Sequence, residues 1–180
     1  MQIAQLKSCT LALYFSLWVI SPVTSAATGT NSVYFTGALV SEACTLQSGD
    51  GSISVNFGEI LDNDLYHHGR SPSKPFQLHL LDCDLSIGKQ LSVSFSGNES
   101  SVLPGLLAVQ QANSGIAVGI EDAGGKAIAL NSGSKEITLE NGNMLLKFAA
   151  WIQGEPQAIK EHTIARGRFS AVATFRLEYL

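Results

Sequence analysis

Apolar and polar residues alternate with a period of two along much of the chain. Residues 91–95 (Leu-Ser-Val-Ser-Phe) show the pattern in its simplest form, and the C-terminal stretch 171–179 carries it over nine positions. Such alternation is typical of antiparallel strands that bury one face and expose the other to water. The same pattern predicts further strands at residues 33–40, 53–57, 76–80, 116–120 and 145–151.

Short segments rich in glycine, asparagine and serine separate these predicted strands. They lie at residues 48–51, 96–98, 123–125, 131–133, 141–143 and 154–156. No long segment keeps a helical period. About seven short strands with turn signals between them predict an all-β protein, specifically a β-sandwich of immunoglobulin type.

The first 26 residues differ from the rest of the chain. Lys7 precedes an apolar run from Leu11 to Ile20, and small residues follow at positions 24–27. A basic start, a short apolar run and a small-residue site predict a secretion signal that is removed after Ala26. A membrane anchor is the alternative, but the run is shorter than the roughly 20 residues that span a bilayer.

Secretion decides how the cysteines are interpreted. Cys9 lies in the signal, so the mature chain keeps only Cys44 and Cys83. In an oxidising compartment two cysteines with no competitor are expected to form a disulfide, and closing a loop of about 40 residues contributes roughly 3–4 kcal/mol. A redox pair or metal site is the alternative. The sequence has no CxxC motif, and its four histidines show no ligand spacing with either cysteine.

Composition and charge indicate a folded protein and exclude some classes of binding partner. Apolar residues make up 45% of the chain and charged residues only 14%, a balance that predicts a folded core rather than disorder. Removing the signal takes away Lys7 and leaves 10 basic against 15 acidic residues, a net charge of −5. A mildly acidic surface has no electrostatic reason to bind nucleic acid or anionic lipid, so we expect neither as a partner.

No motif predicts catalysis, a metal or a cofactor. Residues 119–126 resemble a phosphate-binding loop, but the glycine spacing fails and Ala127 replaces the required Ser or Thr. Asp82 and Asp84 could act as an acid and base pair, although solvated residues at a strand end are the plainer interpretation. We therefore expect that the protein is not an enzyme.

Two further groups of side chains have a functional and a structural interpretation. His67 and His68 could bind metal or sense pH, and a surface loop is the default expectation. Trp151 and Tyr179 could line a sugar site, and core packing is the stronger expectation for both.

The two ends of the mature chain do not suit a self-contained sandwich. The predicted strand at residues 33–40 precedes Cys44 and follows a polar flank at residues 28–32. The last predicted strand runs to the chain end with no partner strand after it. A strand that is apolar on one face and lies at an open edge invites pairing with another chain. Together the two ends indicate that each copy lacks one strand of its own sandwich and carries one additional strand that can pair with another copy.

The same ends carry a family resemblance. The most specific element is a glycine fourteenth from the end, Gly167, followed by alternating apolar residues and the penultimate Tyr179. Other matching segments are residues 33–40 before Cys44, 55–58, 74–80 before Cys83, 119–125 and 128–131. On these motifs the mature chain resembles a pilin of the chaperone–usher fimbriae, in the type 1 fimbrial subunit group. Two stretches depart from the family pattern, the basic Arg-Gly-Arg at residues 166–168 and residues 66–70.

The resemblance implies a fold and a site. Pilins are immunoglobulin-like sandwiches that lack the last strand, and the N-terminal extension of the next subunit fills the gap as a donor strand. Here the extension is residues 27–41 and the pilin domain is residues 42–180. The implied donor side chains are Val33, Phe35, Gly37 and Leu39. The implied groove and chaperone-contacting residues are Gly167, Phe169, Ala171, Ala173, Phe175, Leu177 and Tyr179.

The resemblance also implies partners and a role. The expected partners are other pilin subunits, a periplasmic chaperone and an outer-membrane usher, and the expected location is a fimbrium at the cell surface. The expected function is a structural subunit that polymerises head to tail and supports bacterial adhesion. The alternative is an adhesin or a carbohydrate-binding sandwich. A tip adhesin of this family usually has an extra receptor domain and lacks the donor extension, whereas this chain is one domain long and keeps the extension.

Overall fold

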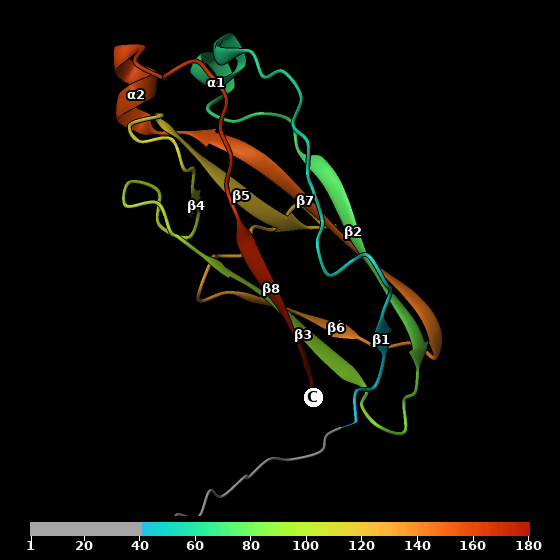
Figure 1. Cartoon of the computed structure of the whole chain (residues 1–180). Coiled ribbons are helices and arrows are strands. Elements are labelled where there is room, and N and C mark those ends of the chain that lie inside the picture. The colour runs from blue at the N-terminus through green and yellow to red at the C-terminus, as the bar shows by residue number, and fades with distance from the viewer. Residues whose placement is uncertain (1–40) are drawn as a thin grey trace, which may run out of the picture. The chain divides into compact units, whose positions relative to one another are not determined.

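The computed structural model describes residues 41–180, which form two β-sheets that pack against each other (Figure 1). The predicted signal and the predicted donor strand lie outside the described residues. The five-stranded sheet has the order β1 (Thr45–Leu46), β2 (Lys74–Cys83), β7 (Gly142–Gly154), β5 (Ile116–Asp122) and β4 (Leu107–Ala108). The three-stranded sheet has the order β6 (Ser134–Thr138), β3 (Gln90–Gly97) and β8 (Ala173–Tyr179). Every paired strand is antiparallel to its neighbour, so the all-β prediction is confirmed.

The core lies between the inner faces of the two sheets. In β3 the apolar positions of the alternating pattern are all buried, and the serines between them face outward. An aromatic cluster joins the sheets, since the ring of Phe95 in β3 lies 5.3 Å from that of Phe148 in β7 and 6.2 Å from that of Phe76 in β2. Aromatic rings at these centroid distances add to the free energy that burial of their area supplies.

The expected disulfide is confirmed. Cys44 and Cys83 are bonded to each other, and both are buried. The bond ties the start of the described chain to the end of β2. It therefore fixes the point from which the N-terminal segment leaves the domain.

The structure differs from the predicted elements in two ways. Residues 53–57 form no regular strand, although their apolar and polar residues alternate. Alternation reports that one face is covered, and it does not supply a backbone partner. The structure also contains strands that the sequence did not predict, namely β1, β4 and β6.

Two short helices lie at the same end of the domain (Figure 1). Helix α1 (Asp62–His68) ends at Gly69, whose φ of 74° is left-handed, and helix α2 (Pro156–Glu161) begins with a proline in its first turn. The glycine at the end of α1 and the proline at the start of α2 follow the capping rules, but neither helix has a side-chain cap at its N-terminus, and each is too short to show a helical period. No helix in residues 41–180 is long and apolar enough to cross a membrane.

Candidate functional site: a groove beside the C-terminal strand

Strand β8 lies at the edge of its sheet, and one side of its backbone is unpaired. Within residues 41–180 it forms a ladder only with β3, from Leu91 opposite Tyr179 to Gly97 opposite Ala173. Its inward side chains are only half-buried, whereas the inward side chains of β3 are fully buried. The inward side chains of β8 are more exposed than those of β3 because, in the part of the chain that the structure describes, no strand lies next to β8 on its unpaired edge. An edge strand with a bare apolar face is a template for another strand.

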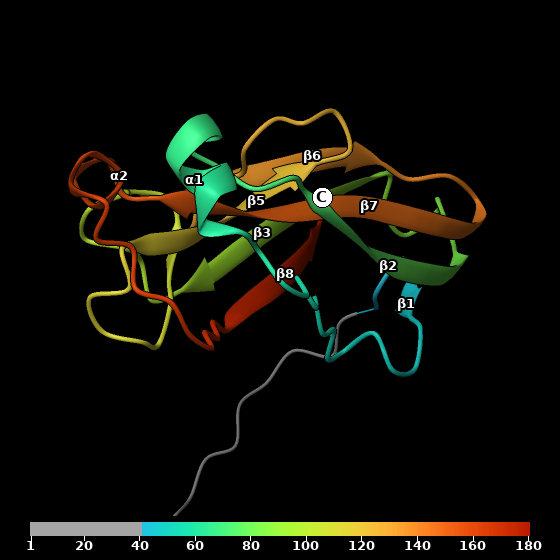
Figure 2. The ribbon, with the colours of Figure 1, turned by 90° about the horizontal axis from the view of Figure 1, so that it is seen from above.

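A groove of about 1450 Å³ runs along this open edge. One wall is the segment of residues 51–62 between β1 and α1, and the other is residues 164–175 (Figures 1 and 2). Its floor is apolar and comes from both sheets, and it includes Phe76, Phe95, Leu107, Ile116, Val118, Ile120, Ala150 and Ile152. An apolar groove of this length suits an extended peptide better than a small polar molecule.

Most of the predicted groove residues line this groove. The lining includes Gly167, Phe169, Ala171, Ala173 and Phe175. Gly167 has a φ of 143°, a conformation that favours glycine. The remaining two predicted residues of this strand lie beyond the groove.

Those two residues, Leu177 and Tyr179, are half-buried against the core at the far end of β8. The hydroxyl of Tyr179 donates a hydrogen bond of 3.0 Å to the carbonyl oxygen of Cys44. Burial raises the pKa of the Tyr179 phenol, and the negative charge of nearby Glu42 raises it further. The described chain therefore begins beside the C-terminal end of β8.

Two contacts join the walls of the groove. The rings of Phe57 and Phe169 lie with their centroids 6.0 Å apart. Nearer the helices, Arg166 forms an ion pair of 2.6 Å with the carboxylate of Asp62, the first residue of α1. The hydrogen bond from Arg166 holds the pKa of Asp62 below its usual value. Neither contact could be predicted from the sequence, because each joins residues more than 100 positions apart.

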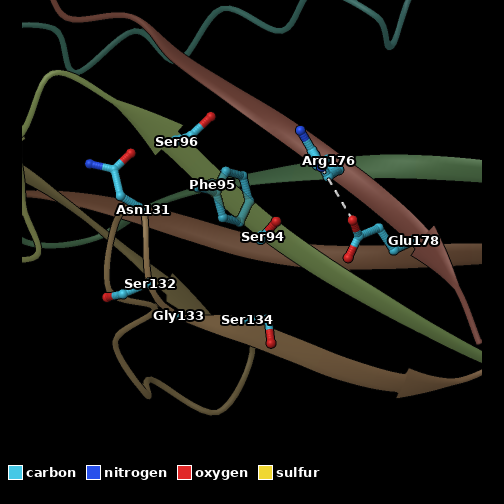
Figure 3. A pocket seen from close by; sticks show the side chains of 9 residues that line it. All are labelled: Ser94, Phe95, Ser96, Asn131, Ser132, Gly133, Ser134, Arg176 and Glu178. Carbon is cyan, nitrogen blue, oxygen red and sulfur yellow. Dashed lines mark hydrogen bonds and ion pairs between the residues drawn. The ribbon is translucent and has the colours of Figure 1, made fainter.

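A second, polar hollow of about 320 Å³ lies on the outer face of the three-stranded sheet. Figure 3 shows Ser94 and Ser96 on β3, Ser132 in the loop before β6 and Ser134 on β6, with Arg176 and Glu178 on β8. These two form an exposed ion pair of 3.3 Å. A sugar site normally combines polar groups with an exposed aromatic ring, and this hollow offers only polar groups and a core phenylalanine. The hollow therefore lends no support to a carbohydrate-binding role.

Trp151 is buried, but it lies outside the main core, on the outer face of the five-stranded sheet. Its indole covers Gly119 so closely that a Cβ at that position would collide with it. The guanidinium of Arg70 stacks on the indole at 4.3 Å and forms an ion pair of 3.2 Å with Glu121. With only 5% of its surface exposed, Trp151 has no free face for a sugar.

The remaining candidate side chains lie on separate elements: the histidine pair, the aspartate pair and the glycine-rich turn. His67 and His68 lie in α1 rather than in a loop, and Asp82 and Asp84 are exposed next to the disulfide. Residues 122–126 form a tight turn in which the carboxylate of Asp122 accepts hydrogen bonds from backbone amides. Within the described residues no group of three or more His, Cys, Asp or Glu could hold a metal ion.

Known proteins are similar to this chain in sequence and in fold. Residues 33–180 match the family described as "Fimbrial protein". The chain is 31% identical over 175 residues to the "Fimbria A protein" of Serratia marcescens, an alignment that covers 97% of this chain and 99% of that protein. It is 33% identical over 177 residues to the "Major MR/P fimbria protein" of Proteus mirabilis (strain HI4320), with coverage of 97% and 99%. The fold resembles the crystal structure of the P pilus rod subunit PapA, with a TM-score of 0.66 and 22% identity over 77% of this chain and 100% of that one.

Proposed function

Because the chain belongs to the fimbrial protein family and is a structural subunit of a fimbrium at the cell surface, we propose that it polymerises by donor-strand exchange. In this proposal residues 27–41 of one copy enter the groove of the next copy and complete its sandwich. Pilin donor-strand complementation is itself a known instance of β-strand addition. We infer from the same membership that the chain is not an enzyme.

The observation that carries the proposal is the open groove beside β8. Its wall from residue 166 to residue 175 is ten residues long, roughly 33 Å of extended chain. A strand of that length places about five side chains on one face. The alternating segment at residues 33–39 supplies four of them, at Val33, Phe35, Gly37 and Leu39.

The path of the chain favours a second copy as the donor. The described chain begins beside Tyr179, at the C-terminal end of β8. If the extension folded back into its own groove, it would run parallel to β8. A strand from another copy is free to run antiparallel to β8. Within the described domain each paired strand is antiparallel to its neighbour, and antiparallel pairing is slightly more stable per residue than parallel pairing.

Side-chain sizes select one register for this antiparallel pairing. The Phe57–Phe169 contact already fills the groove at one point, so the donor residue opposite Phe169 needs to be the smallest. With Gly37 placed there, the positions opposite the large donor side chains are all small. Phe35 then faces Ala171, Val33 faces Ala173, and Leu39 faces Gly167. Large residues meet small ones along the whole stretch, which close packing requires.

This register makes a tight joint. Burying the three large donor side chains contributes about 1.5–3 kcal/mol each, or about 5–9 kcal/mol together. Each backbone hydrogen bond along β8 adds roughly 0.5–1.5 kcal/mol. A free subunit leaves the same apolar groove exposed. This supports the expectation that a strand of a periplasmic chaperone occupies the groove until an outer-membrane usher assembles the polymer.

The test is the electrophoretic pattern of assembled chains that are not heated before SDS gel electrophoresis. We expect a ladder of SDS-resistant oligomers from the mature chain, and only monomer when residues 27–39 are deleted. A matched control replaces residues 27–39 with a scrambled sequence of the same composition, which should also give monomer. A ladder that survives the deletion would show that residues 27–39 are not the donor.

A further inference from the structure

The basic stretch at residues 166–168 lies at the helix end of the groove. Arg166 has 85% of its side chain exposed even though it pairs with Asp62. Arg168 is also exposed, and within residues 41–180 it forms no ion pair. A strand in the groove would pass directly beside these two cations. The basic residues that line the groove are therefore Arg166 and Arg168, and the acidic residues that line it are Glu59 and Asp62.

The one acidic residue of the segment that follows the donor strand is Glu42. It comes three residues after Leu39, roughly 10 Å of extended chain, and it is exposed. In the register that places Gly37 opposite Phe169, Glu42 faces position 164. It is then the diagonal neighbour of Arg166, within reach of long side chains.

Both charges are also exposed. The donor side chains that are proposed to enter the groove have odd numbers, and so do the half-buried residues of its wall from Phe169 to Phe175. Glu42 and Arg166 are not among these residues, so the two charged side chains meet in solvent rather than inside the apolar groove. An arginine has five N–H donors, enough for Arg166 to hold Asp62 of its own chain and a second carboxylate.

We infer that Glu42 of the incoming copy pairs with Arg166 of the accepting copy, and that Arg168 adds to the attraction. The inference rests on the proposed donor-strand joint. It identifies the partner as a second copy of this chain. The pair helps to select the neighbouring subunit and the register of its strand.

Within a single chain the pair cannot form. Glu42 lies beside Tyr179, and its charge raises the pKa of that phenol. Arg166 precedes Tyr179 by thirteen residues, roughly 40 Å of extended chain along the groove. The two charges are therefore at opposite ends of one molecule, and only head-to-tail stacking of two copies brings them together.

The test combines two donor peptides with two forms of the mature chain. The peptides are fluorescent copies of residues 29–43 with either Glu or Lys at position 42. The chains are the wild type and the double variant D62R/R166E, which keeps an internal ion pair but reverses the charge at position 166. Each chain is freshly refolded at submicromolar concentration with excess peptide, and the rates of uptake and release are measured at low and high salt. The variant R176E, on the outer face of β8, is the matched control.

We expect the two oppositely charged combinations to bind roughly three- to tenfold more tightly than the two like-charged ones at low salt. The difference should disappear in 1 M salt, and R176E should behave as the wild type. If all four combinations bind equally, the ion pair is refuted while the donor-strand joint stands. If neither peptide binds either chain, the joint itself is refuted.

Discussion

The sharpest consequence of the proposed register concerns Gly37, the one donor position that has no side chain. We predict that G37L weakens binding of the donor strand because the new side chain meets the Phe57–Phe169 contact. These rings lie 6.0 Å apart, which leaves no room for four more carbon atoms between them. Forcing extra methylene groups into a packed site costs about 1–3 kcal/mol, which corresponds to a roughly 5- to 150-fold loss of affinity.

A compensating change on the groove side makes this prediction specific. F169A removes one of the two rings and opens the space that the introduced leucine needs. Residues in direct contact couple by about 0.5–3 kcal/mol in double-mutant cycles. The G37L strand should therefore bind F169A better than it binds the wild-type groove. T36L adds a side chain of similar size on the outward face of the donor and should change affinity less than about twofold, as surface substitutions usually do.

The assay is competition between peptides of residues 29–43 for the mature chain, followed by native gel electrophoresis. The reasoning is refuted if G37L binds as tightly as the wild-type peptide. It is equally refuted if F169A fails to improve binding of G37L, because the clash then lies elsewhere in the groove.

Three further predictions follow from the described domain. Replacing Cys44 and Cys83 with alanine should lower the free energy of unfolding by roughly 3–4 kcal/mol in urea titrations, because the disulfide restricts the unfolded chain. W151A should cost roughly 3–5 kcal/mol of stability and leave peptide binding unchanged, because the indole packs on the outer face away from the groove. The Asp62–Arg166 ion pair lowers the pKa of Asp62 in the folded state, so its stabilisation is complete above the unfolded value of 3.8 and is lost as pH falls through the folded value. The urea midpoints of wild type and D62A should therefore differ at pH 6 and converge as the pH falls below the folded pKa of Asp62, and an equal gap throughout would contradict the pairing.

The alternating pattern predicted the core strands because burial of one face produces it. It identified β3, whose apolar side chains are fully buried, and β8, whose inward side chains are only half-buried. It failed at residues 53–57, where Val55 and Phe57 face the groove but no strand pairs with their backbone. It also missed β1 and β4, because two residues cannot show a period, and β6, because Ser134–Thr138 has a single strongly apolar residue.

For the candidate site, too, local patterns could be predicted and contacts between distant residues could not. The face shared by alternate residues from Ala171 to Tyr179 could be predicted, since it is a local pattern along one strand, whereas Gly167 and Phe169 were implied only by the family resemblance. The wall-to-wall contacts could not, because Asp62 and Arg166 are 104 residues apart and only the fold brings them together. Where the groove ends could not be predicted either, since the alternating pattern continues to Tyr179 without a break while the groove lining stops at Phe175.

One structural feature connects folding with assembly in this protein. The inward side chains of β8 are left half-exposed in the described domain, so the surface that destabilises a free subunit is the surface that the proposed donor strand would cover. In the proposed joint the two subunits contribute different surfaces: one copy provides the N-terminal extension that precedes Glu42, and the other provides the groove beside β8. A joint between unlike surfaces does not close on itself, so repetition gives a filament. Growth then continues only while each added copy brings a strand that fits the groove, and a change at Gly37 or Arg166 should shorten the filament rather than unfold its subunits.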